Sequence, residues 1–215
     1  MMPRPDYDRF CREYVSEKYK LINHENTPKC LISYSRVCEM EKTLVTKATW
    51  NREPTGLWID IFPIDGAEDD FSLFEDRYAS LTKIFASMQI HRDANKKFSK
   101  EFGFLSNMKS FILKFVFLNG WVSSKLIERM IRGAKAVSFG STAHCADLSC
   151  LDYGPKEWIE TSSFDRYIDV DFNGHKYKAI ADYDKVLRLI YDDYMQLPPK
   201  EEQVPKQGYL RFYWK

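Results

Sequence analysis

Hydrophobic and polar positions along this chain follow two different periods, and each period predicts a different kind of element. Helical spacing is clearest after Asp69 and Asp70, two acids that suit the cap and the first turn of a helix. The apolar stripe that follows them consists of Phe71, Phe74, Tyr78, Leu81 and Phe85. Further helices are expected over 6–20 (with an apolar stripe of Tyr7, Phe10, Tyr14 and Tyr19), 104–118, 121–138 and 182–195.

Strands are predicted by short runs that are rich in β-branched and aromatic residues. Leu31–Val37 and Thr43–Thr46 are two such runs, separated by a charged turn. A hairpin is expected where Tyr167–Phe172 and His175–Ile180 flank an Asn-Gly pair, which favours type I′ turns. Residues 139–156 are expected to be irregular. Because helices and strands do not alternate regularly, the pattern predicts an α+β fold, with residues 1–215 as a single domain.

The segment from Gly56 to Gly66 is an apolar strand that carries one acid, Asp60. Apolar residues around this acid predict a strand covered on both faces, which ends in a turn at Asp65-Gly66. A carboxylate among apolar side chains costs free energy unless a cation or a hydrogen-bond donor satisfies it. We therefore expect Asp60 to bind a metal ion, or to pair with backbone amides or with a nearby Lys or Arg.

Composition narrows the class of protein. A chain of 215 residues with 44% hydrophobic and 15% aromatic residues is typical of a packed globular protein. The 32 basic and 31 acidic residues nearly cancel, so no nucleic-acid partner is expected. Five unevenly spaced cysteines indicate reduced thiols in a cytoplasmic protein. His144, Cys145 and Cys150 could supply three zinc ligands, although they lack the paired spacing of typical zinc sites.

The most apolar run of the chain, Phe111–Leu118, is interrupted by Lys114 and is too short to span a bilayer. A half-buried helix is the favoured interpretation, and an interfacial helix that touches a membrane is the alternative. The N-terminal residues lack the apolar segment of a secretory signal, so none is expected.

Several blocks along the chain, in order, resemble the LicD family. The blocks are Met-Pro-Arg-Pro-Asp-Tyr-Asp-Arg-Phe at 2–10, Ser-Arg-Val-Cys-Glu at 35–39 with Lys42-Thr43, the Gly56–Gly66 segment, and the ending from 153 to 199. The third block is similar to the family pattern G-x-x-IDIFP-x-DG. LicD proteins are phosphocholine and related phosphotransferases, related to fukutin-type proteins, so the resemblance implies a nucleotidyltransferase-like mixed sheet flanked by helices, with a C-terminal hairpin and helix.

The resemblance also implies a metal-dependent transfer. In this scheme two acids on one strand and a third on a neighbouring strand hold Mg²⁺ or Mn²⁺, which assists in-line attack on a nucleotide diphosphate. Asp60 matches the third acid and is the predicted catalytic and metal-binding residue. The family's first two acids precede its Met-Pro-Arg block. We therefore expect an N-terminally incomplete family member or a noncatalytic homologue, with weak or no activity of its own.

Four residues are predicted to bind the substrate. Arg36, Lys42 and Arg4 are candidates for holding a phosphate, against the alternative that Arg36 and Lys42 form surface salt bridges with Glu39 or Glu41. Trp58 could belong to an aromatic cage for a choline group, with Trp50 and Trp158 as further candidates.

The function implied by the resemblance is transfer of phosphocholine or a similar group. The donor would be CDP-linked, and the acceptor a cell-surface glycan such as a teichoic acid, lipopolysaccharide or capsule precursor. Peripheral contact with the inner face of the membrane would accompany a lipid-linked acceptor. The alternative is a fragment or pseudoenzyme that binds nucleotide or glycan without turnover.

Overall fold

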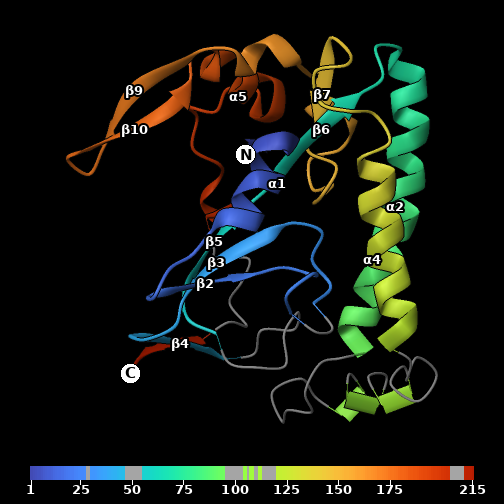
Figure 1. The fold of residues 1–215 in the computed structure, drawn as a ribbon, viewed down its shortest axis with the longest axis vertical. Helices are drawn as coiled ribbons and strands as arrows, with labels where there is room; N and C mark the ends of the chain where they lie inside the picture. The colour runs from blue at the N-terminus through green and yellow to red at the C-terminus, as the bar shows by residue number, and fades with distance from the viewer. Residues whose placement is uncertain are drawn as a thin grey trace.

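The computed structural model describes residues 1–27, 30–46, 55–94, 104–105, 107–108, 111–112, 120–203 and 211–215. Helices and mixed strands within these ranges form an α+β fold, as predicted from the sequence. Figure 1 shows the two long helices, α2 and α4, side by side along one side of the molecule, with the strands and α1 beside them. No helix within the described ranges has the length and apolarity needed to cross a membrane.

The largest sheet in the described part of the chain is mixed and has the order β1-β6-β7-β8. Its strands are β1 (Met2–Pro3), β6 (Pro63–Ala67), β7 (His144–Ala146) and β8 (Ile159–Glu160). The first pair is parallel and the other two pairs are antiparallel. Every residue of β6 is buried, so this strand lies in the core of the sheet.

A second sheet is antiparallel and has the order β2-β3-β5. Its strands are β2 (Tyr19–Ile22), β3 (Ser35–Glu39) and β5 (Trp58–Ile61), and a separate pair joins β4 (Thr43–Thr46) to β11 (Arg211–Trp214). The prediction that the Asp60 strand is covered on both faces was wrong. Among the described strands β5 stands at the edge of its sheet, and Ile59 is 70% exposed, so one face of the strand is open.

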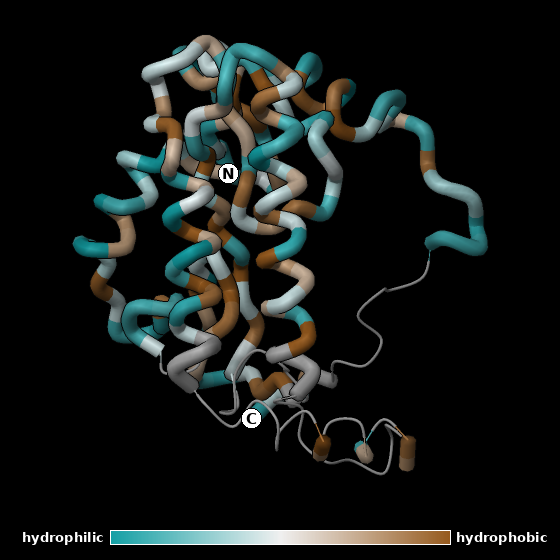
Figure 2. Tube along the Cα trace, turned by 90° about the vertical axis from the view of Figure 1, so that its right-hand side faces the viewer, coloured by the Kyte–Doolittle hydropathy of each residue, from teal (hydrophilic) through white to brown (hydrophobic). Residues whose placement is uncertain are grey.

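Helices α2 (Phe71–Ala94) and α4 (Gly120–Ala134) form the main core cluster. The α2 helix begins after Asp70, whose Oδ1 accepts the backbone N–H groups of Ser72 and Leu73, so the predicted acidic cap is confirmed. A Cβ atom at Gly133 would lie 2.6 Å from Leu81 Cδ2, so glycine allows the two helices to approach closely. Figure 2 shows hydrophobic and hydrophilic residues interspersed along the helices, and α4 has the more pronounced apolar face of the two.

The remaining helices are shorter than predicted. The first, α1 (Arg4–Glu13), begins with Pro5 in its first turn and ends before Tyr19, which lies in β2. The helix α5 (Tyr183–Tyr191) ends well before Pro198. Three 3₁₀ turns cover Pro155–Glu157, Thr161–Phe164 and Lys200–Glu202. Most of the predicted 104–118 helix, including most of its apolar run, lies outside the described residues.

The hairpin was predicted correctly. Strands β9 (Tyr167–Phe172) and β10 (His175–Ile180) pair in register, and the φ angles of Asn173 and Gly174 are +51° and +77°. Both turn residues are thus left-handed, as a type I′ turn requires. Figure 1 shows this hairpin reaching away from the two long helices.

Two local predictions were wrong. The Asp65-Gly66 pair does not form a turn, because it lies in the buried strand β6. Residues 139–156 are not irregular throughout, because they contain β7. The predicted strand over Leu31–Val37 is displaced towards the C-terminus and is observed as β3.

Candidate functional site

Asp60 lies directly opposite Arg36 in the ladder between β3 and β5. Arg36 Nε donates a hydrogen bond to Asp60 Oδ1 at 2.5 Å, and the two side chains are 7% and 26% exposed. A guanidinium therefore satisfies the acid, which is one of the interpretations that the sequence left open. The alternative pairing of Arg36 with Glu39 or Glu41 was wrong, because its carboxylate partner is Asp60 on the neighbouring strand.

Two aromatic rings frame this ion pair. Arg36 Nη2 donates to the Tyr34 hydroxyl at 2.7 Å, and the guanidinium lies 4.6 Å from the Trp58 ring centroid and 5.4 Å from that of Tyr34. Because alternate residues of an extended chain share a face and directly opposite residues of neighbouring strands do so too, Tyr34, Arg36 and Asp60 lie on one face of the sheet. Trp58 thus already lies against a cation, which is the chemistry expected of a choline-binding ring.

The other tryptophan candidates lie elsewhere. Trp158 stacks on His144 with ring centroids 3.5 Å apart, and its Nε1–H donates to the Glu68 carbonyl. It packs against the core cluster of α2 and α4, whereas Trp58 packs against the cluster of β2 and β3. Trp50 lies outside the described residues. Within the described ranges, therefore, Trp58 and Trp158 do not share one cage.

Lys42 lies in the exposed turn between β3 and β4. This turn is held by Glu39, whose carboxylate accepts the Thr43 hydroxyl and the backbone N–H groups of Glu41, Lys42 and Thr43. These hydrogen bonds, led by that from the Thr43 hydroxyl, lower the pKa of Glu39 to about 2. Glu39 therefore organises the turn, while the Lys42 side chain points from an exposed position. The role of Lys42 in binding stays a prediction.

Arg4 and Asp65 form a buried ion pair between α1 and β6. Arg4 Nε donates to Asp65 Oδ1 at 2.7 Å, and Nη2 donates to Oδ2 at 2.5 Å. The residues are 8% and 1% exposed, so both charges are removed from water together. Since the hydrogen bonds are bidentate, the position of the guanidinium is fixed. Asp65 thus has a structural role, as the sequence favoured, but its partner is Arg4 and not its own backbone.

The first strand runs beside the segment that carries Asp60. β1 is parallel to β6, and the backbone N–H of Met2 donates to the Phe62 carbonyl at 2.8 Å. The first residues of the chain therefore lie beside β6, the strand that follows β5 and Asp60 in the sequence. The role of Asp60 as the third acid of the family scheme stays a prediction.

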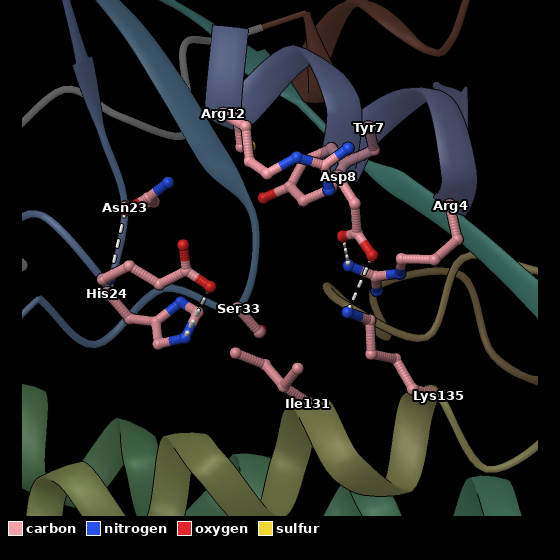
Figure 3. A pocket seen from close by; sticks show the side chains of 11 residues that line it. Arg4, Tyr7, Asp8, Arg12, Asn23, His24, Ser33, Ile131 and Lys135 are labelled. Atoms are coloured by element: carbon pink, nitrogen blue, oxygen red, sulfur yellow. Dashed lines mark hydrogen bonds and ion pairs between the residues drawn. The ribbon is translucent and has the colours of Figure 1, made fainter.

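A cavity of about 270 Å³ lies on the other side of β3, between α1, the β2–β3 connection and the end of α4 (Figure 3). Its lining includes Arg4, Asp8, Arg12, His24 and Lys135. A neighbouring hollow of about 520 Å³ shares Arg4, Asp8, Arg12 and Lys135 with it. Sequence reasoning found only Arg4 of this set, because the others come from three separate stretches of the chain.

Two buried acids were also missed. Glu157 and Asp147 are 2% and 4% exposed. Burial, reinforced by the neighbouring carboxylates of Asp147 and Asp152, raises the pKa of Glu157 to about 8. Burial likewise raises the pKa of Asp147 to about 6, opposed by hydrogen bonds from Ser149. The sequence feature that could have pointed to Glu157 is its place in the Pro-Lys-Glu-Trp block, where it directly precedes a tryptophan.

Neither candidate metal site is assembled within the described residues. No group of three His, Cys, Asp or Glu side chains there could hold a metal ion. His144 pairs with Asp69, and Cys150 donates to Asp152, so the zinc candidates have other partners. Asp60 offers a single carboxylate that Arg36 already contacts, and Mg²⁺ requires several oxygen ligands. The described side chains alone thus do not fit a protein-held magnesium ion.

The comparison with curated proteins finds a similarity to a LicD protein. The chain is 26% identical over 214 residues to "Lipopolysaccharide cholinephosphotransferase LicD" of Haemophilus influenzae. The match covers 95% of this chain and 75% of the length of that relative. No protein-family model matches the chain, and no solved structure matches it. The match supports membership of the LicD family and confirms the resemblance that the sequence blocks predicted.

Proposed function

We propose that this protein is a phosphotransferase of the LicD type, which moves phosphocholine or a similar group from a CDP-linked donor to a hydroxyl group of a cell-surface glycan. The observation that carries the proposal is the match to a cholinephosphotransferase over 95% of the chain. Lipopolysaccharide is the acceptor named for that relative, and teichoic acid and capsule precursors are further candidates of the same chemistry.

The arrangement around Asp60 supports a role in phosphate chemistry. Arg36 places a positive charge beside Asp60, where it can neutralise an approaching phosphate oxygen. Trp58 and Tyr34 provide aromatic faces within reach of a cation. Anionic and cationic parts of a phosphocholine group would thus each meet a complementary side chain on one face of the sheet.

Mg²⁺ or Mn²⁺ belongs to this proposal as the ion that would neutralise the donor diphosphate. Asp60 is the described residue proposed to contact it, through a carboxylate oxygen, with phosphate oxygens as further ligands. The described side chains alone do not form a complete site for the ion. What the chain itself supplies is charge and orientation from Arg36, Asp60 and Trp58.

Transfer of labelled choline tests the proposal. The purified chain is incubated with CDP-choline labelled in the choline group, MnCl₂ and lipopolysaccharide lacking phosphocholine. The expected result is labelled lipopolysaccharide and an equal amount of CMP, both reduced at least tenfold in Asp60→Asn. The matched control is Asp169→Asn, an acid on the exposed hairpin that should behave as wild type.

A second candidate function is binding of a CDP-linked compound without turnover. The observation that favours it is the Arg36–Asp60 ion pair together with the lack of a three-carboxylate group among the described side chains. Calorimetry of CDP-choline binding, combined with the transfer assay, separates the two functions. Under this second function CDP-choline binds, but neither CMP nor labelled lipopolysaccharide accumulates.

We further propose that the protein acts in the cytoplasm, with peripheral contact at the inner face of the membrane. Large apolar side chains in the described helical residues before 113 are exposed, among them Phe104, Leu105 and Ile112. No acid lies between Glu101 and Glu128, whereas three lysines do, and this charge pattern suits an anionic lipid surface. Sedimentation with phosphatidylglycerol vesicles tests this location. Leu105→Ser should lower the fraction of protein that sediments with the vesicles.

A further inference from the structure

The cavity of about 270 Å³ under α1 holds the Asp8 carboxylate between two cations. Asp8 accepts an ion pair from Lys135 Nζ at 2.9 Å, and its other oxygen lies 3.7 Å from Arg4 Nη1 (Figure 3). Asp8 is 34% exposed and sits on a surface helix, so its carboxylate can rotate out of the cavity. The Arg4 guanidinium is less mobile than Asp8, because Asp65 of β6 holds it by two hydrogen bonds.

Arg12 adds a third cation one helical turn further along α1. Opposing charge comes from Asp8 itself, from Asp65, which pairs with Arg4, and from Glu25, whose side chain is 72% exposed and therefore screened by water. Burial lowers the pKa of the neighbouring His24; Lys135 and Arg4 act in the same direction, and Glu25 opposes them. The imidazole is thus neutral near pH 7, and displacing the Asp8 carboxylate would leave a cationic cavity.

The floor of the cavity is polar but uncharged. Tyr7, Asn23 and Ser33 line it and are each at least nine-tenths buried. Their hydrogen bonds run to Ser35 and to the Ser149 carbonyl, which fixes them in place. Fixed amide and hydroxyl groups beside a cationic edge suit a ligand that combines a phosphate with a hydroxyl-rich ring.

We propose that this cavity binds a phosphate ester of a sugar or nucleoside, with the phosphate replacing the Asp8 carboxylate between Lys135, Arg12 and Arg4. The site lies on the α1 side of β3, where Ser35 contacts Tyr7, and so is separate from the Arg36–Asp60 pair on the other face. The inference goes beyond the proposed function, because binding here requires neither transfer nor Asp60. A cavity of about 270 Å³ with an adjoining hollow of about 520 Å³ has room for such a compound.

Calorimetric titration with CMP and with glucose 6-phosphate tests the proposal, with cytidine and glucose as the uncharged counterparts. At least one phosphate ester should bind, and its counterpart should bind at least tenfold more weakly. Binding of CMP alone identifies a nucleotide ligand, binding of glucose 6-phosphate alone identifies a sugar phosphate, and binding of both identifies the phosphate as the common feature. If neither ester binds, the proposal is overturned.

Variants of exposed residues locate the binding. Lys135→Gln and Arg12→Gln should each lower the affinity for the ester by about fivefold to tenfold, as expected when a charge-assisted hydrogen bond is lost. Asp8→Asn should tighten it by about threefold, because the competing carboxylate is removed. Arg132→Gln and Arg9→Gln, exposed cations on the same helices but outside the cavity lining, should remain within twofold of wild type.

The sign of the Asp8 effect distinguishes a binding site from a purely structural ion pair. If the ion pair of Asp8 and Lys135 only connects α1 to the end of α4, one of two results is expected. Either Asp8→Asn and Lys135→Gln both lower the affinity for the ester, or neither variant changes it. Both results refute the proposal. The outcome is independent of the transfer assay. A chain that binds CMP in a Lys135-dependent way but transfers no choline retains this site and loses the proposed function.

Discussion

Replacing Glu157 with glutamine should remove a pH-dependent penalty from the folded state. The carboxyl group is 2% exposed, and its pKa is raised to about 8 from an ordinary value of 4.5. Between these two values the folded protein binds a proton that the unfolded chain releases. Stability therefore falls as the pH rises through this window, and the full penalty applies above pH 8.

The size of the effect follows from the difference between the two pKa values. A difference of about 3.5 corresponds to at most about 5 kcal/mol, at roughly 1.4 kcal/mol for each pH unit. Because local opening admits water, we expect Glu157→Gln to be more stable than wild type by about 2–4 kcal/mol at pH 8.5. At pH 4.5, where the carboxyl group is protonated in the folded state, the two proteins should differ by much less.

Urea denaturation followed by circular dichroism at several pH values between 6 and 8.5 measures this difference. The pKa of Asp147 is raised to about 6, at the lower end of this range, and its carboxylate contributes to the raised pKa of Glu157, so the comparison is made on the values above pH 7. The N-terminal amine and His24 are common to both proteins and cancel in the comparison. Glu75→Gln, an exposed acid on α2, is the matched control. Equal dependence on pH in wild type and Glu157→Gln would refute the reasoning.

Three further predictions concern other residues. Asp65→Leu leaves the Arg4 guanidinium buried without its partner and should lower the free energy of unfolding in urea by about 3–5 kcal/mol. The double variant with Arg4→Met should recover much of this loss, and a loss below about 1 kcal/mol in the single variant contradicts the buried pair. Asp60→Asn should weaken Mn²⁺ binding measured by calorimetry with CDP-choline present, and unchanged binding rejects Asp60 as a metal ligand. Asp70→Ala removes the cap of α2 and should lower stability by about 1 kcal/mol in thermal unfolding, while Asp76→Ala, further along the same helix, should have little effect; equal losses rule out the capping role.

Elements that depend on local chemistry could be predicted from the sequence. The hairpin follows from an Asn-Gly pair between alternating strands, and both residues have the positive φ angles that this turn needs. The start of α2 follows from an acid that can cap it. In each case the deciding contacts lie within a few residues of one another, so the sequence window contains the whole cause.

Features that depend on distant partners were missed or misread. Asp65-Gly66 resembles a turn locally, but Arg4, 61 residues away, holds Asp65 inside a strand. A Cβ atom at Gly66 would also collide with the Ser138 carbonyl, so this glycine is required by close packing. Likewise, the 70% exposure of Ile59 depends on what packs over its face of β5, and these partners lie outside the strand's own sequence.

The candidate site divides in the same way. The Gly56–Gly66 block identified Asp60 and its need for a partner, and Arg36 was selected independently from the β3 block. That the two residues lie opposite each other depends on the register of β3 and β5. The cavity under α1 was not predictable, because its cations come from α1 and from the end of α4, more than 120 residues apart.

The most direct test of the central claim is ³¹P nuclear magnetic resonance of CDP-choline incubated with the purified chain, MgCl₂ and lipopolysaccharide that lacks phosphocholine. A LicD-type transferase predicts that the two diphosphate signals decline while those of CMP and of a new glycan phosphodiester rise together, and that Asp60→Asn slows the change at least tenfold. Diphosphate signals that persist unchanged would contradict the account, as would the same conversion in Asp60→Asn.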